Sequence, residues 1–276
     1  MNLPKITAAG ALALAATLAL ASCTSQTPAP AEESKGIELS LAAGTNPTQR
    51  ALGKIYADQL RAAGYQVTEL QGSEDPYQQV LDGAADVAIA ESTAAEVEAA
   101  DNAGANARSL APSGANGSAV LVMSAAEAKH HSVDSVDSLA AACAELSFIG
   151  TQEPSQALLV SLADAGCAKP EVKTVDEQQL VGQLRASLDR VLVLGSAEAI
   201  IGDEGFYTVP GSGEIFEDEP VVPLAGENLD EQAQKIVDEV SDQLDQEALI
   251  GINRMVSGAD ALDPETAATR YKLLNN

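Results

Sequence analysis

The sequence predicts an α/β protein of two lobes, each built from one β-α-β-α-β unit. Short aliphatic and β-branched runs alternate with helical patterns of ten or more residues, which is typical of parallel sheets with right-handed crossovers. One turn is also written twice, as GTNPTQ at 44–49 and as GTQEPSQ at 150–156, each time between a predicted strand and a predicted helix. With 276 residues and 46% apolar content, the chain can form two hydrophobic cores.

The first unit begins with a β-type run at 37–42. Asn46 then stands at an N-cap position and Pro47 at a first helical position, so a helix is expected to begin there. Apolar residues recur at helical spacing until Gly64, which favours a helix end. The remaining elements are a strand at 66–70, a helix at 75–83 and a strand at 86–90.

The second unit repeats this order after the second turn. Pro154 marks the start of its first helix and Gly166 marks the end. The strands and the second helix are predicted at 145–149, 171–175, 176–188 (the helix) and 189–196. Because the two units keep the same order and similar spacing, they are expected to form two similar sheets.

The ends of these strands carry the candidate ligand-binding residues. In open α/β sheets, ligands gather beyond the carboxyl ends of strands, where helix N-termini present free N–H groups. Two such ends facing across a cleft would hold one ligand from both sides. The alternative is that Ser, Thr and Asn before a Pro are ordinary helix caps and that Glu91 is a solvated carboxylate. The candidates are Thr45, Asn46, Gln49, Glu91, Ser92, Asn116, Thr151, Gln152, Ser155 and Ser196.

The N-terminus has the pattern of an export signal. The Ala/Leu-rich run at 8–21 is shorter than the roughly 20 residues that span a membrane, so residues 1–22 are predicted to be a signal peptide. The run ends on LASC, which resembles the lipobox of bacterial lipoproteins and implies that Cys23 is lipidated. The alternative is an ordinary signal with a chance cysteine. Residues 23–36 are predicted to be a flexible tether.

Charge and cysteine content narrow the function further. With 41 acidic and 15 basic residues, the net charge is −26, which disfavours binding to nucleic acid or to an anionic membrane surface. This charge favours cationic or neutral ligands, or simply keeps the protein soluble. In an exported chain, Cys143 and Cys167 are expected to form a disulfide, and two buried free thiols are the alternative.

Patterns for other chemistry are absent from the sequence. There is no CxxC pair, and the adjacent His130 and His131 cannot converge on one metal ion without further ligands. No GxSxG motif occurs, and GSGE at 211–214 lacks the pattern of a phosphate-binding loop. We therefore expect no enzyme activity, no metal and no cofactor. A helix at 229–249 with one apolar stripe is expected to pack on its own lobe.

Five stretches resemble one known family from residue 37 to the C-terminus. They are the segments at 44–67, 75–89, 110–122, 219–229 and 239–271, including GTNPTQRALGKIYADQLRAAGYQV and LAPSGANGSAVLV. In this order they are similar to the substrate-binding proteins of glycine betaine/choline (quaternary amine) ABC transporters. The resemblance implies a type II periplasmic-binding-protein fold, in which a two-strand hinge joins the lobes.

The same resemblance implies domain boundaries and partners. Lobe 1 would comprise residues 37–118 and 219–276, and lobe 2 residues 119–218. The expected partners are a small-molecule solute, the ABC permease and ATPase subunits, and the membrane through the lipid anchor. No nucleic acid is expected. The protein is expected to be exported and lipid-anchored to the outer face of the bacterial cell membrane.

The chain departs from this family where aromatic residues are expected. Members commonly hold a trimethylammonium group between aromatic rings, but Ser92 stands where a Tyr would fall, and Ser118 and Ala119 occupy a loop in which relatives often carry Tyr. Three explanations stay open: other rings contribute, the ligand is more polar, or solute binding has been lost. The last would leave a sensory or interaction lipoprotein that carries no quaternary amine. The rings that could contribute are Phe206, Tyr207 and Phe216.

Overall fold

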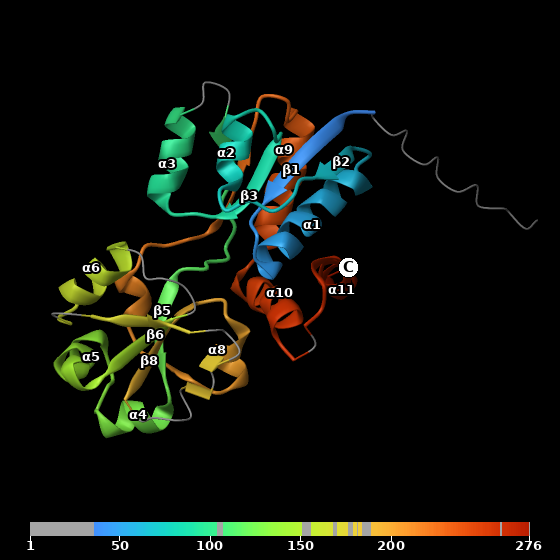
Figure 1. Ribbon diagram of the computed structural model, residues 1–276. Helices are drawn as coiled ribbons and strands as arrows, with labels where there is room; N and C mark the ends of the chain where they lie inside the picture. The colour runs from blue at the N-terminus through green and yellow to red at the C-terminus, as the bar shows by residue number, and fades with distance from the viewer. Residues whose placement is uncertain are drawn as a thin grey trace, which may run out of the picture. The chain divides into compact units, whose positions relative to one another are not determined.

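The computed structural model contains two five-stranded sheets in its described part, each flanked by helices (Figure 1). The structure describes residues 36–103, 107–150, 156–167, 170–175, 179–180, 182–183, 189–259 and 261–275. The predicted signal peptide, Cys23 and nearly all of the predicted tether lie outside these residues. Within them, no helix is both long and apolar enough to cross a membrane.

The first sheet has the strand order β2-β1-β3-β10-β4. Its strands β1 and β2 are parallel, as are β1 and β3, whereas β10 runs antiparallel to both β3 and β4. The first three strands therefore form the predicted β-α-β-α-β unit, and β10 joins it from the far end of the chain. The strands are β1 (Glu38–Ala43), β2 (Gln66–Glu69), β3 (Val87–Glu91), β4 (Arg108–Ser109) and β10 (Val221–Ala225).

The second sheet has the matching order β7-β6-β8-β5-β9. Here β6 is parallel to β7 and β8, and β5 runs antiparallel to β8 and β9. The predicted α/β class with two equivalent units is thus confirmed. The strands are β5 (Ala119–Met123), β6 (Ser147–Gly150), β7 (Val172–Thr174), β8 (Arg190–Gly195) and β9 (Tyr207–Thr208).

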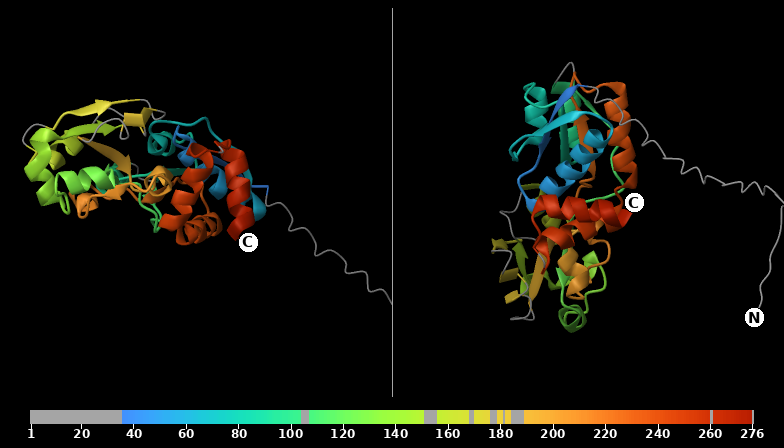
Figure 2. Two further views of the ribbon diagram at one scale, coloured as in Figure 1. Left: turned by 90° about the horizontal axis from the view of Figure 1, so that it is seen from below. Right: turned by 90° about the vertical axis from the view of Figure 1, so that its right-hand side faces the viewer.

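Helices cover both faces of the first sheet. The side chains of β1 alternate, so that Leu39 and Leu41 pack in one core and Ala42 packs in another. Helices α1 (Pro47–Ala62) and α9 (Glu231–Gln243) cover the first of these faces, and α2 (Pro76–Leu81) and α3 (Ala94–Ala103) cover the second (Figure 1; Figure 2, right). Burial on both faces explains why these strands read as nearly continuous apolar runs.

The helix starts of the first unit lie where the sequence predicts them. The Asn46 side chain accepts a hydrogen bond from the backbone N–H of Gln49 (2.8 Å), and the Asp75 side chain accepts one from that of Gln78 (2.9 Å). Each cap satisfies an N–H group that the helix itself leaves unpaired. Gly64 follows α1 with a φ of 95°, a left-handed conformation that glycine adopts without strain.

The second sheet also carries helices that the structure describes at least in part. The second predicted helix of this unit, at 176–188, falls largely outside the described residues. Two apolar clusters flank the sheet, one containing Phe148 and the other containing Ile149, which are consecutive on β6 and face opposite sides. The helical elements are α4 (Ala125–His130), α5 (Val136–Ala142), η1 (Cys143–Glu145), α6 (Gln156–Asp164), α8 (Ala199–Asp203) and η2 (Ser212–Ile215).

The C-terminal region departs from the prediction of one helix at 229–249. The chain forms α9, a break at Leu244, and then α10 (Gln246–Ser257) and α11 (Pro264–Asn275). The break occurs because Asp245 is extended and its side chain accepts a hydrogen bond from the N–H of Ala248 (2.8 Å), which caps a new helix. Apolar side chains of α9, α10 and α11 share one core with α1.

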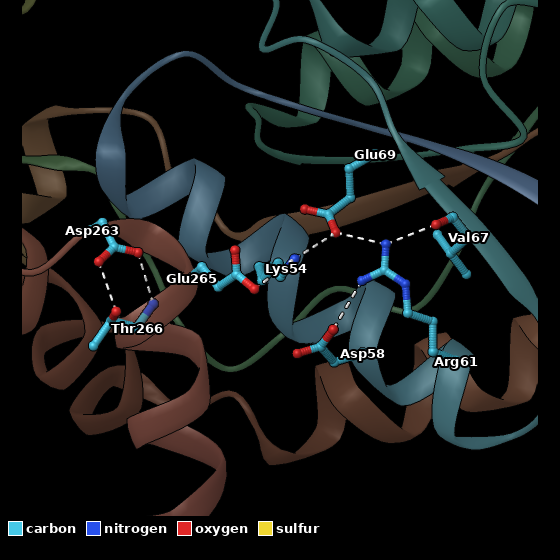
Figure 3. Close-up of polar contacts among 8 residues, drawn as sticks. All are labelled: Lys54, Asp58, Arg61, Val67, Glu69, Asp263, Glu265 and Thr266. Atoms are coloured by element: carbon cyan, nitrogen blue, oxygen red, sulfur yellow. Dashed lines mark hydrogen bonds and ion pairs between the residues drawn. The ribbon is translucent and has the colours of Figure 1, made fainter.

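A network of charged side chains joins α1 to β2. Glu69 accepts hydrogen bonds from Lys54 (3.1 Å) and Arg61 (2.7 Å), and Arg61 also donates to the carbonyl of Val67 (2.7 Å) and to Asp58 (2.9 Å) (Figure 3). These side chains are about one third exposed or less, so solvent screens their attraction only in part. The network fixes α1 against the strand that follows it.

A disulfide joins Cys143, at the start of η1, to Cys167, just after α6. The two Cα atoms lie 5.5 Å apart, within the range that a disulfide needs. Cys167 belongs to the apolar cluster around Phe148. The bond therefore links two helical segments that cover the second sheet.

Candidate cavity at the crossover segments

Two segments cross between the sheets. The first crossover, residues 110–118, leads from β4 to β5, and the second, residues 216–220, leads from η2 to β10. They run side by side, because the N–H of Gly117 donates to the carbonyl of Glu219 (3.0 Å) and Asn116 forms a bridge with Pro220. This paired crossing connects the two sheets where the two-strand hinge is expected.

A cavity of about 560 Å³ opens beside these crossover segments. Its walls come from both crossovers, from β5, from the residue after β8, from η2 and from the start of α10, a helix that packs in a core of the first sheet. Two of the predicted ligand residues, Asn116 and Ser196, lie in its lining. The described lining residues are Asn116, Ser118, Val120, Ser196, Gly213, Glu214, Phe216, Asp218 and Gln246.

The side chain of Asn116 forms hydrogen bonds with both crossover segments, which line the cavity. Its side-chain N–H donates to Asp218 (2.7 Å), and its side-chain oxygen accepts from the N–H groups of Ser118 and Glu219 (2.9 Å each). Its polar side-chain atoms are therefore already engaged within the protein. The ligand contact that the sequence predicts for this residue stays a prediction; in the structure its side chain links the two crossovers.

The backbone N–H and carbonyl of Asn116 also form hydrogen bonds. Its N–H donates to the side-chain oxygen of Gln246 (2.8 Å), and its carbonyl accepts from Gln246 (3.1 Å) and from the hydroxyl of Ser196 (2.6 Å). Through these bonds Asn116 ties the start of α10 and the end of β8 to the first crossover.

The helix start at α1 is engaged in local contacts. Asn46 caps α1, and the Thr45 hydroxyl donates to Glu74 (2.9 Å). Ser92 is 4% exposed, and its hydroxyl forms a hydrogen bond with the neighbouring phenol of Tyr77. Burial raises the pKa of Tyr77 to about 12, and the Ser92 hydrogen bond opposes this rise. None of the predicted ligand residues Thr45, Asn46 and Ser92 lines the described part of the cavity, although they lie at strand or helix ends as expected.

Glu91 and Gln49 form a pair on the other side of the first crossover. Gln49 donates to the Glu91 carboxylate (3.4 Å), and the Cβ position of Gly117 points at that carboxylate. Asn116 and Ser118, on either side of Gly117, line the cavity instead. Because neighbouring side chains on an extended segment point to opposite sides, Glu91 lies across this segment from the cavity.

The environment of Glu91 disfavours its charged form. Burial raises the pKa of Glu91 to about 7; the amide of Gln49 opposes this rise, and the nearby carboxylates of Glu219 and Glu198 add to it. The carboxyl group therefore changes its protonation near neutral pH, unlike the solvated carboxylate that the sequence alone leaves open.

Most of the second turn, residues 150–156, lies outside the described residues. Thr151, Gln152 and Ser155 lie outside the described residues, although Gly150 ends β6 and Gln156 begins α6 on either side of them. Whether they face a ligand stays a prediction.

One of the three aromatic candidates lines the cavity. Phe216 belongs to its lining and also packs, like Tyr207, against the cluster around Phe148, whereas Phe206 packs with Ile149 on the other face of the second sheet. The described lining thus offers a ligand a single aromatic ring.

Glu214, Asp218 and Gln246 are among the lining residues that the sequence does not predict. Asp218 and Glu214 precede the return strand, where an acidic run gives no sign of which carboxylate faces inward. Gln246 follows Asp245, and the sequence DQEA is a helix-start signal that could have revealed α10. Its contact with Asn116, by contrast, depends on tertiary folding.

Metal-binding geometry is not found in the described part of the chain, where no group of three or more His, Cys, Asp or Glu residues could hold an ion. His130 and His131 have ring centroids 4.8 Å apart, and His131 faces Glu145 (3.7 Å) and Asp189 (3.5 Å) rather than the cavity.

Solved structures with the same fold support this assignment of the architecture. The chain is similar to a crystal structure described as a glycine betaine/carnitine/choline ABC transporter, with a TM-score of 0.66, 11% identity, and coverage of 86% of this chain and 98% of the other. It is also similar to a choline-binding protein of an ABC transporter in complex with choline (TM-score 0.62, 15% identity, coverage 86% and 88%). A third is lactococcal OpuAC complexed with glycine betaine (TM-score 0.63, 12% identity, coverage 87% and 96%).

At these identities the structures show the fold alone, and they confirm the expected periplasmic-binding-protein fold. No curated protein matches the sequence. The family comparison is more informative, because residues 38–272 match the family described as the substrate binding domain of ABC-type glycine betaine transport systems. This match spans both sheets, both crossover segments and every described residue of the cavity lining. The chain belongs to this family of substrate-binding domains of ABC-type glycine betaine transport systems.

Proposed function

We propose that this protein is the lipid-anchored, solute-binding component of an ABC importer. It holds a small compatible-solute-like molecule of the glycine betaine, choline and osmoprotectant class and delivers it to a membrane permease. Its family consists of solute-binding proteins rather than enzymes. The observation that carries the proposal is the cavity at the crossover segments, because β5 of the second sheet and α10, which packs in a core of the first sheet, both line it. Closure of two lobes about such a hinge would bury a ligand.

The proposal divides the folded chain into lobe 1 (37–118 and 219–276) and lobe 2 (119–218). The strand orders support this division, since β10 returns to the first sheet while β5 to β9 form the second. The two crossovers would then be the hinge. The predicted lipid on Cys23 and the tether at 23–36 would keep the binding lobes close to the permease on the outer face of the cell membrane.

Solute binding is tested by thermal unfolding of the mature chain with a panel of osmolytes, amines and amino acids. A ligand that binds only the folded state at 100 times its Kd stabilises it by about 2.7 kcal/mol, so at least one compound is expected to raise the Tm by several degrees. A panel that leaves the Tm unchanged throughout would argue against a solute-binding role.

Lipid anchoring and transport need separate measurements. Cys23→Ala is expected to release the protein from the membrane fraction, and mass spectrometry of the wild-type N-terminus is expected to find a diacylglyceryl group on Cys23. Deletion of the gene is expected to abolish uptake of the solute that the Tm panel identifies. Intact uptake in the deleted strain would contradict a role in import.

A second candidate function is a surface lipoprotein with a sensory or interaction role and no transported quaternary amine. The single ring in the described cavity lining favours it, because one ring provides only about 0.5 to 2 kcal/mol of cation–π attraction. Solute binding without any dependence of uptake on the gene would support this second function.

A further inference from the structure

The charges around the cavity disfavour a ligand that carries a carboxylate, which is a common feature of osmolytes. Glu214 and Asp218 contribute carboxylates, and none of the nine described lining residues is Lys, Arg or His. A zwitterionic ligand would therefore place its carboxylate among negative charges with no cationic side chain in this lining to offset it. The net charge of the chain, −26, acts in the same direction. The cavity thus favours a cation without a carboxylate.

The lining also provides little for a quaternary nitrogen. A trimethylammonium group has no N–H to donate and is held mainly by the faces of aromatic rings. Among the described lining residues only Phe216 has a ring, since the other nearby aromatic candidates, Phe206 and Tyr207, pack in the cores of the second sheet. Methyl groups on nitrogen would instead meet carboxylate, hydroxyl and amide oxygens.

Hydrogen-bond acceptors, by contrast, are available. Asp218 uses Oδ1 to accept from Asn116, and within the described residues neither its Oδ2 atom nor the Glu214 carboxylate receives a hydrogen bond. Ser118 is 4% exposed and lines the cavity, yet its hydroxyl has no hydrogen-bond partner in the described part of the chain. A hydroxyl in the cavity wall that has no partner within the protein is available to a ligand or to water.

From these three features, and resting on the proposed solute-binding function, we infer that the cavity selects a small organic cation with at least one N–H on its charged nitrogen and no carboxylate. An amino alcohol in its ammonium form has this chemistry. Its N–H donates to Asp218 or Glu214 and approaches the Ser118 hydroxyl, while its carbon atoms pack on Phe216. Charge-assisted hydrogen bonds of this kind are stronger than neutral ones.

A methylation series at constant charge tests the inference. Isothermal titration calorimetry of the mature chain compares ethanolamine, its N-methyl and N,N-dimethyl derivatives, and choline, all monovalent cations at pH 7. N,N-dimethylethanolamine is expected to bind roughly 10-fold or more tightly than choline, because only the last methylation removes the final N–H. Glycine betaine is expected to bind more weakly than choline because of its carboxylate.

The outcomes separate this inference from the proposed function. If choline or glycine betaine binds as tightly as N,N-dimethylethanolamine or more tightly, the inference is overturned while solute binding stands. If no member of the series and no compound of the wider panel binds, both are overturned.

Substitutions locate the effect within the cavity. Asp218→Asn and Glu214→Gln preserve shape but remove charge, and each is expected to reduce the preference for N,N-dimethylethanolamine over choline by several-fold. Glu217→Gln is the matched control, since Glu217 lies between Glu214 and Asp218 in the sequence, is exposed and is not part of the lining. Ser118→Ala is expected to weaken binding of the amine more than that of choline. Unchanged preferences in all three cavity variants would contradict the assigned site.

Discussion

The carboxylate of Glu91 lies directly against the backbone of Gly117. A Cβ atom at Gly117 would overlap Glu91 Oε1, so this glycine leaves the space that the carboxylate occupies. Gly117 belongs to the first crossover, and its neighbours Asn116 and Ser118 line the cavity. A buried acid thus packs against the segment that connects the two sheets.

This contact predicts a pH dependence of stability. The folded-state pKa of Glu91 is about 7 and its ordinary value is 4.5, so between these values the folded state binds more protons than the unfolded state. The free energy of unfolding therefore falls as pH rises through this window, and no such penalty exists below it. Denaturant titrations of wild type and Glu91→Gln at pH 4 and pH 8 are expected to show that the substitution removes roughly 2 kcal/mol of this loss. Parallel pH profiles of the two proteins would refute the assignment.

Asn253 of α10 is expected to contribute more to stability than its neighbour Arg254. The Asn253 side chain is 7% exposed; its oxygen accepts from the N–H of Ala199 (2.9 Å), and its amide donates to the Thr48 hydroxyl (3.3 Å). Asn253→Ala leaves the N–H at the start of α8 without this partner and is expected to cost about 2 kcal/mol in urea unfolding. Arg254→Ala removes an exposed ion pair with Asp203 and is expected to cost less than about 1 kcal/mol. Equal costs would contradict the capping role.

Two helical glycines are expected to respond in opposite directions to substitution by Ala. A Cβ at Gly53 in α1 would lie 2.7 Å from Cβ of Ala43, whereas a Cβ at Gly251 in α10 meets nothing within 4 Å. Gly53→Ala is expected to lower the free energy of unfolding by roughly 1 to 3 kcal/mol through overpacking. Gly251→Ala is expected to raise it by up to about 1 kcal/mol through helix propensity. Stabilisation by both substitutions would show that α1 lies farther from β1.

The disulfide between Cys143 and Cys167 is expected to stabilise the fold. The two cysteines are 24 residues apart, and closing a loop of that length restrains the unfolded chain by roughly 3 kcal/mol. The double variant Cys143→Ser/Cys167→Ser is expected to lose about this amount, measured as the shift in urea midpoint. Wild-type protein treated with a reductant serves as the control and should match the variant. Labelling of two free thiols in untreated protein would exclude the bond.

The sequence by itself determined the strands and helix starts of the first unit and the repetition of that unit. Asn46 and Asp75 mark helix starts because a side-chain cap acts over three residues, and Pro47 fixes the backbone of the next position. The nearly continuous apolar runs of β1 and β3 reflect the two covered faces of the sheet. Helix caps and strand patterns involve residues only a few positions apart, so they can be recognised in the sequence. The paired turns that predict two equivalent units can be recognised in the same way.

Tertiary structure alone decided which polar groups line the cavity. Asn116 meets Gln246, which is 130 residues away along the chain, and Glu91 falls on the opposite side of the crossover from Ser118. Both outcomes depend on how the crossovers, η2 and α10 pack together, and no local pattern of residues encodes that packing. For the same physical reason, the sequence placed Phe216 among three aromatic candidates, and only folding made it the one of the three that lines the cavity.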